Sequence, residues 1–273
     1  MAYQALGEGA LDYLPCRYGR TRLLFRGPRR DLSGYFVAAL GGIETYGRYV
    51  PRPWPVLVEE ATGMRVVNLG CPQAGPDAWL SDPALFDVLE RAAVVVVQIT
   101  AASDVTNRLY AVHPRRNDRF IRAAPLLQTV YRGVDFTDFS FTRHMLRALH
   151  MADPARFALV AEEVRAAWLA RMGMVLDRIR GRKLLLWMGE QAPGSRSDAP
   201  LGEPLLVDQA MLDALGPKVD GVALAVPSVA ARRRGTEGMV FPAMAEPAAR
   251  GLPGVAVHEE VAQAVAAALR GMG

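Results

Sequence analysis

The segment AALGGIETYG, residues 38–47, is an apolar run followed by a glycine-rich turn that carries two side chains capable of catalysis. The carboxylate of Glu44 can exchange a proton with a substrate, and the hydroxyl of Thr45 can attack an ester when a base activates it. Ile43, which directly follows the two glycines, can do no chemistry. The turn therefore allows three interpretations: an active site, a disabled site or a structural turn.

His258, near the start of the last predicted helix, is the other group on which catalysis could depend. Glu44 and His258 could form a general acid/base pair that acts on water without a covalent intermediate, and Thr45 is the alternative nucleophile. Structural roles stay open for both members of the pair. A polar residue at a helix start often caps the free N–H groups there, and Glu44 could accept hydrogen bonds within its own turn.

A phosphate-binding loop is a further alternative for the glycine-rich turn. The spacing from Gly42 to Gly47 fits G-x-x-x-x-G, but Arg48 and Tyr49 stand where a nucleotide-binding loop has Lys and Ser or Thr. The four histidines are scattered along the chain, and two cysteines are too few for a zinc site or a disulfide framework. We therefore predict no nucleotide, no other cofactor and no metal.

Five apolar runs are suited to buried strands, and helical segments lie between them. The clearest run is AAVVVVQI, in which β-branched residues without alternation indicate a strand covered on both faces. The runs are Tyr35–Leu40, Met64–Leu69, Ala92–Ile99, Lys183–Met188 and Gly221–Val226. Because strands and helices alternate, we predict an α/β fold with a doubly wound, mainly parallel five-stranded sheet, which is a flavodoxin-like three-layer sandwich.

Two helices have strong sequence signals. Apolar residues spaced three or four apart predict a helix over Pro154–Arg180, with Asp153 as its N-terminal cap and Gly181 at its left-handed exit. The segment Glu259–Arg270 is predicted to form the last helix. In a parallel sheet the ligand binds beyond the carboxyl ends of the strands, so the loops between these elements should hold the site.

The chain is predicted to form a single α/β domain over residues 1–273, with two parts that fall outside the strand and helix alternation. Residues 1–33 form an N-terminal arm rich in glycine, arginine and tyrosine. Residues 100–153 are too long for an idle loop, and we interpret them as an insertion that shapes the pocket rim. The aromatic stretch 131–146 either covers the sheet edge as a satellite core or forms a sticky patch.

The order of elements over about residues 35–270 resembles the SGNH (GDSL-type) ester hydrolases. That family carries its nucleophile in a Gly-Asp-Ser turn after the first strand, and Gly41-Gly42-Ile43 stands at this place. The oxyanion-hole glycine of the family matches Gly70 or Gly75 of the stretch NLGCPQAG.

Two further positions carry this resemblance. Asn107 matches the oxyanion-hole asparagine, within SDVTN instead of Gly-x-Asn-Asp, and His258 matches the histidine of the family. The aspartate that would orient this histidine is replaced by Val255. The resemblance therefore implies a hydrolase-like pocket that lacks its usual nucleophile and orienting carboxylate. The stretches YLPCRYG, FRGPRR, GGxETYG and HPRRNDRF also resemble an uncharacterised alphaproteobacterial family, which implies no established activity.

Composition limits the compartment and the partners. No window reaches the roughly 18 apolar residues of a membrane-spanning helix, and the N-terminal segment lacks the features of a secretory signal. We therefore expect a cytoplasmic protein with no membrane partner. The net charge of +4 is modest and the arginine clusters lack interleaved aromatics, so we expect no nucleic-acid partner.

Three functions remain open at this point. The first is a repurposed or non-catalytic SGNH-like pocket that recognises a polar small-molecule ligand such as a sugar or an acylated glycan. Its ligand-binding residues would be Gly42, Gly70, Gly75, Asn107 and Arg108, with Glu44 and His258 at the mouth. The second is an active ester or acetyl hydrolase that uses the Glu44/His258 pair or Thr45. The third is an interaction or assembly protein, which allows a homo-oligomer.

Overall fold

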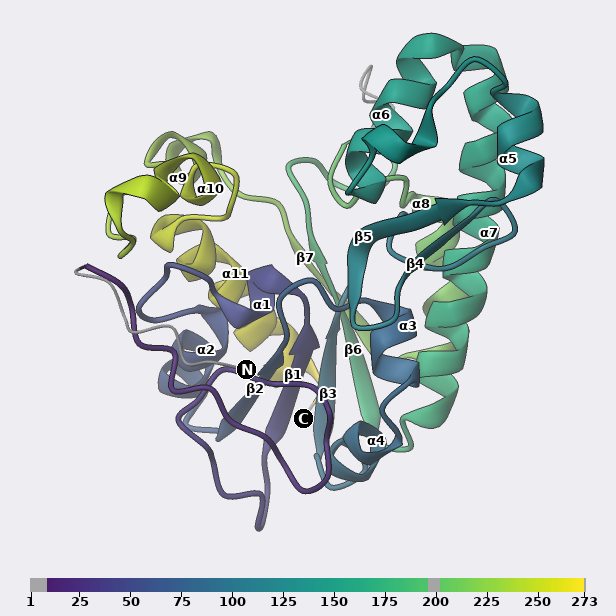
Figure 1. The fold of residues 1–273 in the computed structure, drawn as a ribbon. Helices are drawn as coiled ribbons and strands as arrows, with labels where there is room; N and C mark the ends of the chain where they lie inside the picture. Colours follow the sequence, from purple (N-terminus) through teal and green to yellow (C-terminus); the bar gives the residue numbers. More distant parts are fainter. Residues whose placement is uncertain (1–8, 196–201, 273) are drawn as a thin grey trace.

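Five strands lie side by side in one parallel sheet in the order β2-β1-β3-β6-β7 (Figure 1). The computed structural model describes residues 9–195 and 202–272. The strands of the sheet are β1 Val37–Gly41, β2 Val66–Gly70, β3 Val94–Gln98, β6 Arg182–Met188 and β7 Gly221–Ala225. The prediction of an α/β fold with a five-stranded parallel sheet is confirmed.

The strand order reverses its direction between β1 and β3. The chain passes from β1 outward to β2 and then returns across β1 to β3. In an open parallel sheet such a reversal leaves a crevice beyond the carboxyl ends of the two strands. Residues that follow β1 and β3 are therefore well placed to line a ligand site.

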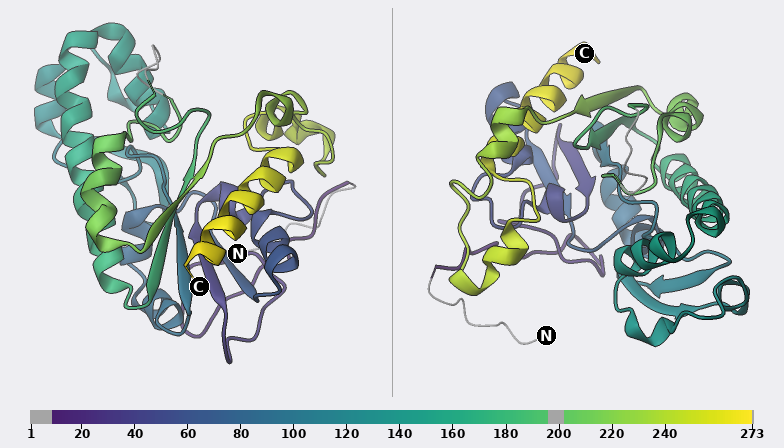
Figure 2. Two further views of the ribbon diagram at one scale, coloured as in Figure 1. Left: turned by 180° about the vertical axis from the view of Figure 1, so that it is seen from behind. Right: turned by 90° about the horizontal axis from the view of Figure 1, so that it is seen from above.

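Helices cover both faces of the sheet, as Figure 2 shows from two further directions. Helices α2 (Trp54–Thr62) and α11 (Val255–Gly271) pack on one face. Helices α3 (Pro76–Leu80), α4 (Pro83–Leu89) and α7 (Pro154–Arg178) pack on the other. The three layers match the doubly wound arrangement that alternating strands and helices predict.

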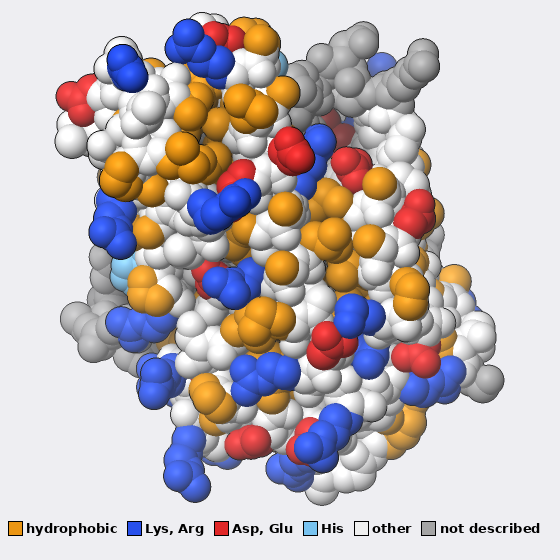
Figure 3. Space-filling model, turned by 90° about the vertical axis from the view of Figure 1, so that its right-hand side faces the viewer, with side chains coloured by type: hydrophobic (Ala, Val, Ile, Leu, Met, Phe, Trp, Pro, Cys, Tyr) orange, Lys and Arg blue, Asp and Glu red, His pale blue; other side chains and the backbone are white. Residues whose placement is uncertain are grey.

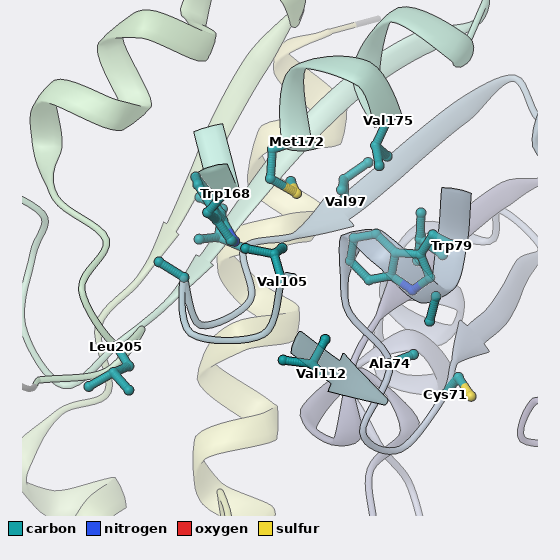
Figure 4. Close-up of a cluster of buried hydrophobic side chains, with 14 of the residues drawn as sticks. Cys71, Ala74, Trp79, Val97, Val105, Val112, Trp168, Met172, Val175 and Leu205 are labelled. Carbon is teal, nitrogen blue, oxygen red and sulfur yellow. The ribbon is translucent and has the colours of Figure 1, made fainter. Parts of the chain in front are cut away.

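The side chains of β3 divide between the two helical layers. All five residues of this strand are buried. Val94 and Val96 belong to the apolar cluster beneath α2 and α11, whereas Val95 and Val97 belong to the cluster beneath α7. Figure 4 shows Val97 close to Val175 of α7. Because both faces of β3 are covered, its sequence carries no polar alternation.

Helix α7 begins at the residue that its sequence signal indicates and ends earlier than predicted. The carboxylate of Asp153 accepts the N–H of Arg156 at 3.0 Å and caps the first turn. The helix ends at Arg178 because Ile179 already has an extended conformation. Gly181 is not among the residues with a left-handed φ, so the predicted glycine exit was wrong.

The segment between β3 and α7 forms a substructure of its own. It contains the antiparallel strands β4 Tyr110–His113 and β5 Arg116–Ala123, then α5 Pro125–Val130, the 3-10 helix η1 Phe136–Asp138 and α6 Thr142–Ala152. The rings of Phe136 and Phe139 pack against the main apolar cluster, whereas Phe141 is 40% exposed. Most of the aromatic stretch therefore contributes to the core.

Short helices complete the fold. They are α1 Ile43–Tyr46, α8 Gln209–Leu215, η2 Gly216–Lys218, α9 Val229–Arg233, η3 Ala243–Ala245 and α10 Glu246–Ala249. Helix α11 begins at Val255 rather than Glu259, so His258 lies within its first turn. No helix in residues 9–195 and 202–272 is long and apolar enough to cross a membrane.

The face of the molecule that carries α5 and α7 has a mixed surface. Figure 3 shows apolar side chains there in groups between Lys, Arg, Asp and Glu side chains. Leu159 and Met174 of α7 are 63% and 48% exposed. Scattered apolar residues of this kind are normal on protein surfaces and indicate no particular partner.

Candidate functional site

A cleft of about 890 Å³ lies at the carboxyl ends of the strands, between two walls. One wall is the N-terminal part of α6, and the other is α9 with the loop 250–254 that precedes α11. The two walls rise on either side of the sheet in Figure 1. The residues that follow β1 and β3 form the floor, at the position where the strand order reverses.

Gln98, the last residue of β3, holds the glycine-rich turn in place. Its Oε1 accepts the N–H of Gly42 at 3.0 Å, the N–H of Thr45 at 3.3 Å and the hydroxyl of Thr45 at 2.6 Å. Its Nε2 donates to Oε2 of Glu44 at 2.8 Å. Gln98 is buried, and its bonds to Gly42 and Thr45 form out of contact with water. One amide thus fixes both the backbone of the turn and the direction of the Glu44 carboxylate.

The turn presents Ile43 and Glu44 to the cleft and hides Thr45. Both Ile43 and Glu44 line the cleft, whereas Thr45 is fully buried and its hydroxyl donates to Gln98. Residues of the short helix α1 point in different directions, so Ile43 and Glu44 face the cleft while Thr45 points into the protein. The prediction of Thr45 as a nucleophile was therefore wrong, because no ligand in the cleft reaches its hydroxyl.

His258 does not face the cleft. Its side chain is 1% exposed, and Nδ1 accepts the backbone N–H of Trp54 at 3.1 Å, at the start of α2. The residues of α11 that line the cleft are Val257 and Val261. Burial lowers the pKa of His258 to about 3, so the imidazole is neutral. The predicted Glu44/His258 acid/base pair was therefore wrong.

The buried position of His258 has a signal in the sequence. Residues 258, 262 and 266 are spaced four apart and lie on one face of α11. Ala262 and Ala266 are buried together with His258. A stripe of small residues indicates a helix face packed closely against a neighbour, and here that neighbour is α2. The histidine belongs to this packed stripe.

Asn107 and Arg108 also lie away from the cleft. Oδ1 of Asn107 accepts the N–H groups of Leu109 and Tyr110 at 2.9 and 3.1 Å, so the side chain closes its own turn. Arg108 forms an ion pair with Glu163 of α7 at the surface. Neither residue lines the cleft. Their predicted contact with the ligand was wrong.

The two glycines of the stretch NLGCPQAG have structural roles. A Cβ at Gly70 would overlap the backbone nitrogen of Tyr46, so this glycine lets α1 approach β2. Gly75 donates its N–H to Oδ1 of Asn117 at 2.9 Å, and a Cβ there would lie 3.1 Å from the same oxygen. Of the predicted ligand-binding glycines, only Gly42 lines the cleft. Gly70 and Gly75 shape the loops behind it.

A second carboxylate, Asp104, faces the cleft from the loop after β3. Its Oδ1 accepts the hydroxyls of Ser103 at 2.7 Å and Thr142 at 3.3 Å. Burial and the nearby charge of Asp118 raise the pKa of Asp104 to about 7. Burial also raises the pKa of Glu44, and the hydrogen bond from Gln98 opposes this shift. The floor therefore holds two carboxyl groups whose pKa values are raised by burial.

Two polar atoms in the cleft are left without a protein partner. Thr100 is 7% exposed, and its Oγ1 makes no hydrogen bond to any part of the chain that the structure describes. Oδ1 of Asp118, on β5, is likewise unpaired within the described ranges. Both residues line the cleft. Because an unmet buried polar atom costs about 1–3 kcal/mol, a ligand or water that pairs with either atom would stabilise this part of the cleft.

The sequence contained only part of this site. The stretch QITAASD, which carries Gln98, Thr100 and Asp104, directly follows the valines of β3, so its place at the strand end was predictable. Asp118 and Thr142 come from the segment between β3 and α7, where no local pattern marks them. Only the packing of α6 and β5 against the loop after β3 brings them to the cleft.

Comparison with solved structures finds five matching chains, among them the following two. A lipase from a goat rumen metagenome has 11% sequence identity and a TM-score of 0.44, with 88% of this chain and 98% of that chain covered. A structural genomics target from Lactobacillus plantarum has 14% identity and a TM-score of 0.42, with 87% and 97% covered. A search of curated proteins finds no match to the sequence. A family model described as a domain of unknown function (DUF6473) matches residues 1–273, and the chain belongs to this family.

Proposed function

We propose that the cleft binds a polar, hydroxyl-rich ligand such as a sugar or an acylated glycan, on an SGNH-hydrolase-like fold that has lost its usual nucleophile. The carrying observation is Thr100, a cleft-lining residue whose buried hydroxyl lacks a hydrogen-bond partner in the described chain. A ligand hydroxyl can both donate to and accept from such a group. The cleft volume of about 890 Å³ lies within the usual range for small-molecule sites.

The remaining lining residues support a ligand of this kind. Glu44 and Asp118 offer carboxylate oxygens that accept hydrogen bonds from hydroxyls. Phe141 on the α6 wall adds an exposed apolar ring. Ile43 stands where the resemblance places the nucleophilic serine, and His258 packs against α2 instead of facing the cleft. The serine and histidine that SGNH enzymes use for acyl transfer are therefore both missing from the cleft. These features favour recognition over covalent catalysis.

The variant Thr100→Val tests this function. Valine has nearly the shape of threonine, and the lost hydroxyl has no protein partner, so the free energy of unfolding should stay the same or rise. Binding of the best ligand from a panel of mono- and disaccharides should weaken about tenfold, which corresponds to about 1.4 kcal/mol. Isothermal titration calorimetry and urea unfolding measure the two quantities.

Thr129→Val is the matched control for Thr100→Val. Thr129 is exposed on α5, donates to Pro125 at 2.9 Å and does not line the cleft. Its replacement should leave ligand affinity unchanged. Equal affinity in Thr100→Val and the unaltered protein, or no binding of any saccharide, would show that the cleft does not serve this function.

A hydrolase that works with two carboxyl groups is the second candidate. The observation that favours it is Asp104, whose pKa is raised to about 7 by burial, so that it can give or take a proton near neutral pH. Glu44, also with a raised pKa, would be its partner in the cleft. Together they could act on water beside an ester without a covalent intermediate.

This candidate predicts a particular pH profile. Turnover of acetylated sugars or short aryl esters should show an inflection near the pKa of Asp104, at about pH 7, and Asp104→Asn should remove that inflection together with most of the rate. Asp138→Asn, in the exposed 3-10 helix η1, is the control. Absence of turnover in the unaltered protein, or an unchanged profile in Asp104→Asn, would eliminate this candidate.

A further inference from the structure

Both walls of the cleft carry positive charge. On one wall, Arg143 and Arg147 of α6 line the cleft. On the other, Arg232 of α9 and Arg250 after α10 line it. These two walls come from segments far apart in the chain and stand on opposite sides of the floor (Figure 1). Cationic side chains thus reach the outer part of the cleft from two directions.

The protein neutralises only some of these cations. Arg143 forms an ion pair with Glu203, and Arg250 pairs with Glu246 at 2.7 Å. Arg147 has no ion pair or side-chain hydrogen bond within residues 9–195 and 202–272.

Arg232, on the opposite wall, is also without a carboxylate partner in the described ranges. Its guanidinium donates only to the carbonyl oxygen of Glu190, at 3.3 Å. Both Arg147 and Arg232 are exposed, so water reaches them. Two guanidinium groups, one from each wall, are therefore free to bind an anion.

The charge pattern of α6 has a cost that an anion would offset. Arg143 and Arg147 lie four residues apart on one face of this helix. Like charges at this spacing destabilise a helix by a few tenths of a kcal/mol, and Glu203 relieves only the first of them. The opposite face of α6, with Met145 and Leu146, packs into the core and holds the arginine pair toward the cleft.

The cleft is therefore polarised from floor to rim. Carboxyl groups, Glu44 and Asp104, lie at the floor beside the unpaired Thr100 hydroxyl. Arginines lie on the walls, where Glu190 is the one exposed carboxylate among the lining residues that the structure describes. A neutral sugar would use the floor alone. An anionic group on the same ligand would use the walls as well, because guanidinium binds carboxylate, sulfate and phosphate through charge-assisted hydrogen bonds.

We propose that the ligand is an anionic sugar, with its hydroxyls at the floor and a carboxylate, sulfate or phosphate group bound at the wall by Arg147 or, on the opposite side, by Arg232. This inference rests on the proposed function and adds the chemical class of the ligand. The three oxyanions share the chemistry that the arginines recognise, and they differ in charge and in the number of oxygens. A titration with matched sugars separates them.

Calorimetric titration of the full chain with matched neutral and anionic sugars tests the proposal. The panel contains glucose and galactose, their uronic acids, and their 6-sulfates and 6-phosphates. At least one anionic sugar should bind about tenfold more tightly than its neutral parent at low salt. Because both arginines are exposed, the preference should shrink when about 0.5 M sodium chloride is added.

The double variant R147Q/R232Q should bring the anionic sugar to within about twofold of its neutral parent and leave the affinity of the neutral sugar unchanged. Arg122→Gln, an exposed residue of β5 outside the cleft, should keep the full preference. Equal binding of neutral and anionic sugars, or a preference that survives in R147Q/R232Q, would overturn the proposal while the proposed function stands. Failure of every sugar to bind would overturn both.

Discussion

Replacement of Gln98 by leucine is expected to lower the free energy of unfolding by about 3–5 kcal/mol and to weaken ligand binding more than tenfold. Leucine has a volume similar to that of glutamine, so the main loss is that of hydrogen bonds and not of packing. The N–H groups of Gly42 and Thr45 and the Thr45 hydroxyl all lose their acceptor in a buried position. Each buried donor left without a partner costs about 1–3 kcal/mol.

The loss of binding has a separate cause. Nε2 of Gln98 holds Oε2 of Glu44 at 2.8 Å, so Gln98→Leu frees the carboxylate to take other positions. Glu44→Ala separates the two effects, because Gln98 still accepts from the turn while the carboxylate that it orients is removed. We expect Glu44→Ala to lose less stability than Gln98→Leu and to bind the ligand as poorly.

Urea unfolding and calorimetry measure both effects in Gln98→Leu and Glu44→Ala. Gln128→Leu, at an exposed position of α5, is the control for a change from amide to aliphatic side chain and should change neither quantity. A Gln98→Leu protein with the stability and affinity of the unaltered chain would contradict the role of this amide as the support of the glycine-rich turn.

The second large effect is expected at His258, whose replacement by alanine should destabilise the fold by about 3–4 kcal/mol without acting on the cleft. The substitution removes a fully buried ring and leaves the N–H of Trp54 without its acceptor. His258→Asn should cost less, because its Oδ1 can take the place of Nδ1. Urea unfolding at about pH 8 gives the comparison.

His258 also predicts loss of stability in acid. Its pKa is lowered to about 3 in the folded chain, from an ordinary value of about 6.5, because burial disfavours the imidazolium ion. Above about pH 6.5 the ring is neutral in both states, and its stabilisation is fully present. As the pH falls, the unfolded chain binds a proton that the folded chain cannot accept, so about 2 kcal/mol should be lost by pH 5.

Unfolding measured between about pH 8 and pH 5 tests this linkage. The His258→Asn protein should lack the part of the decline that the imidazole causes. His113→Asn is the control, because His113 accepts the N–H of Arg115 at the surface and should leave the decline in place. If His258→Ala instead kept full stability and lost ligand binding, the histidine would belong to the cleft after all.

Two of the sequence stretches, FRGPRR and HPRRNDRF, hold the loops of the cleft in position. Arg26 of FRGPRR is buried and donates to the carbonyl oxygens of Tyr46, Gly47 and Pro51 at 3.1, 2.6 and 2.9 Å. It thereby fixes the end of the glycine-rich turn. Asn117 of HPRRNDRF is also buried, and its Oδ1 caps the start of α3 by accepting the N–H groups of Gly75 and Ala78. These residues support the cleft without contacting its interior.

The fold was predictable because its signals are local. The continuous apolar run of β3 indicates a strand that is covered on both faces. The apolar stripe of α7 and its Asp153 cap are patterns within one short segment. Helix starts and ends were less certain. Helix α11 begins at Val255, directly after its extended N-cap residue Gly254, which is four residues before the predicted start at Glu259.

The site depended on contacts between distant residues. Sequence order alone indicated that Gly42 and Glu44 follow the first strand, and both line the cleft. Sequence order could not show that His258 turns toward α2. Which neighbour a helix residue contacts depends on how the helices pack in the folded chain.

For this protein, then, the residue pattern by itself determined the parallel sheet, its two helical layers and the strand end at which a ligand would bind. Only the tertiary structure decided which polar groups meet there, such as Gln98 behind the turn and Asp104 beneath α6. The physical reason is that strand and helix periodicity act over a few residues. Hydrogen bonds and raised pKa values arise instead between groups that folding brings together from distant parts of the chain.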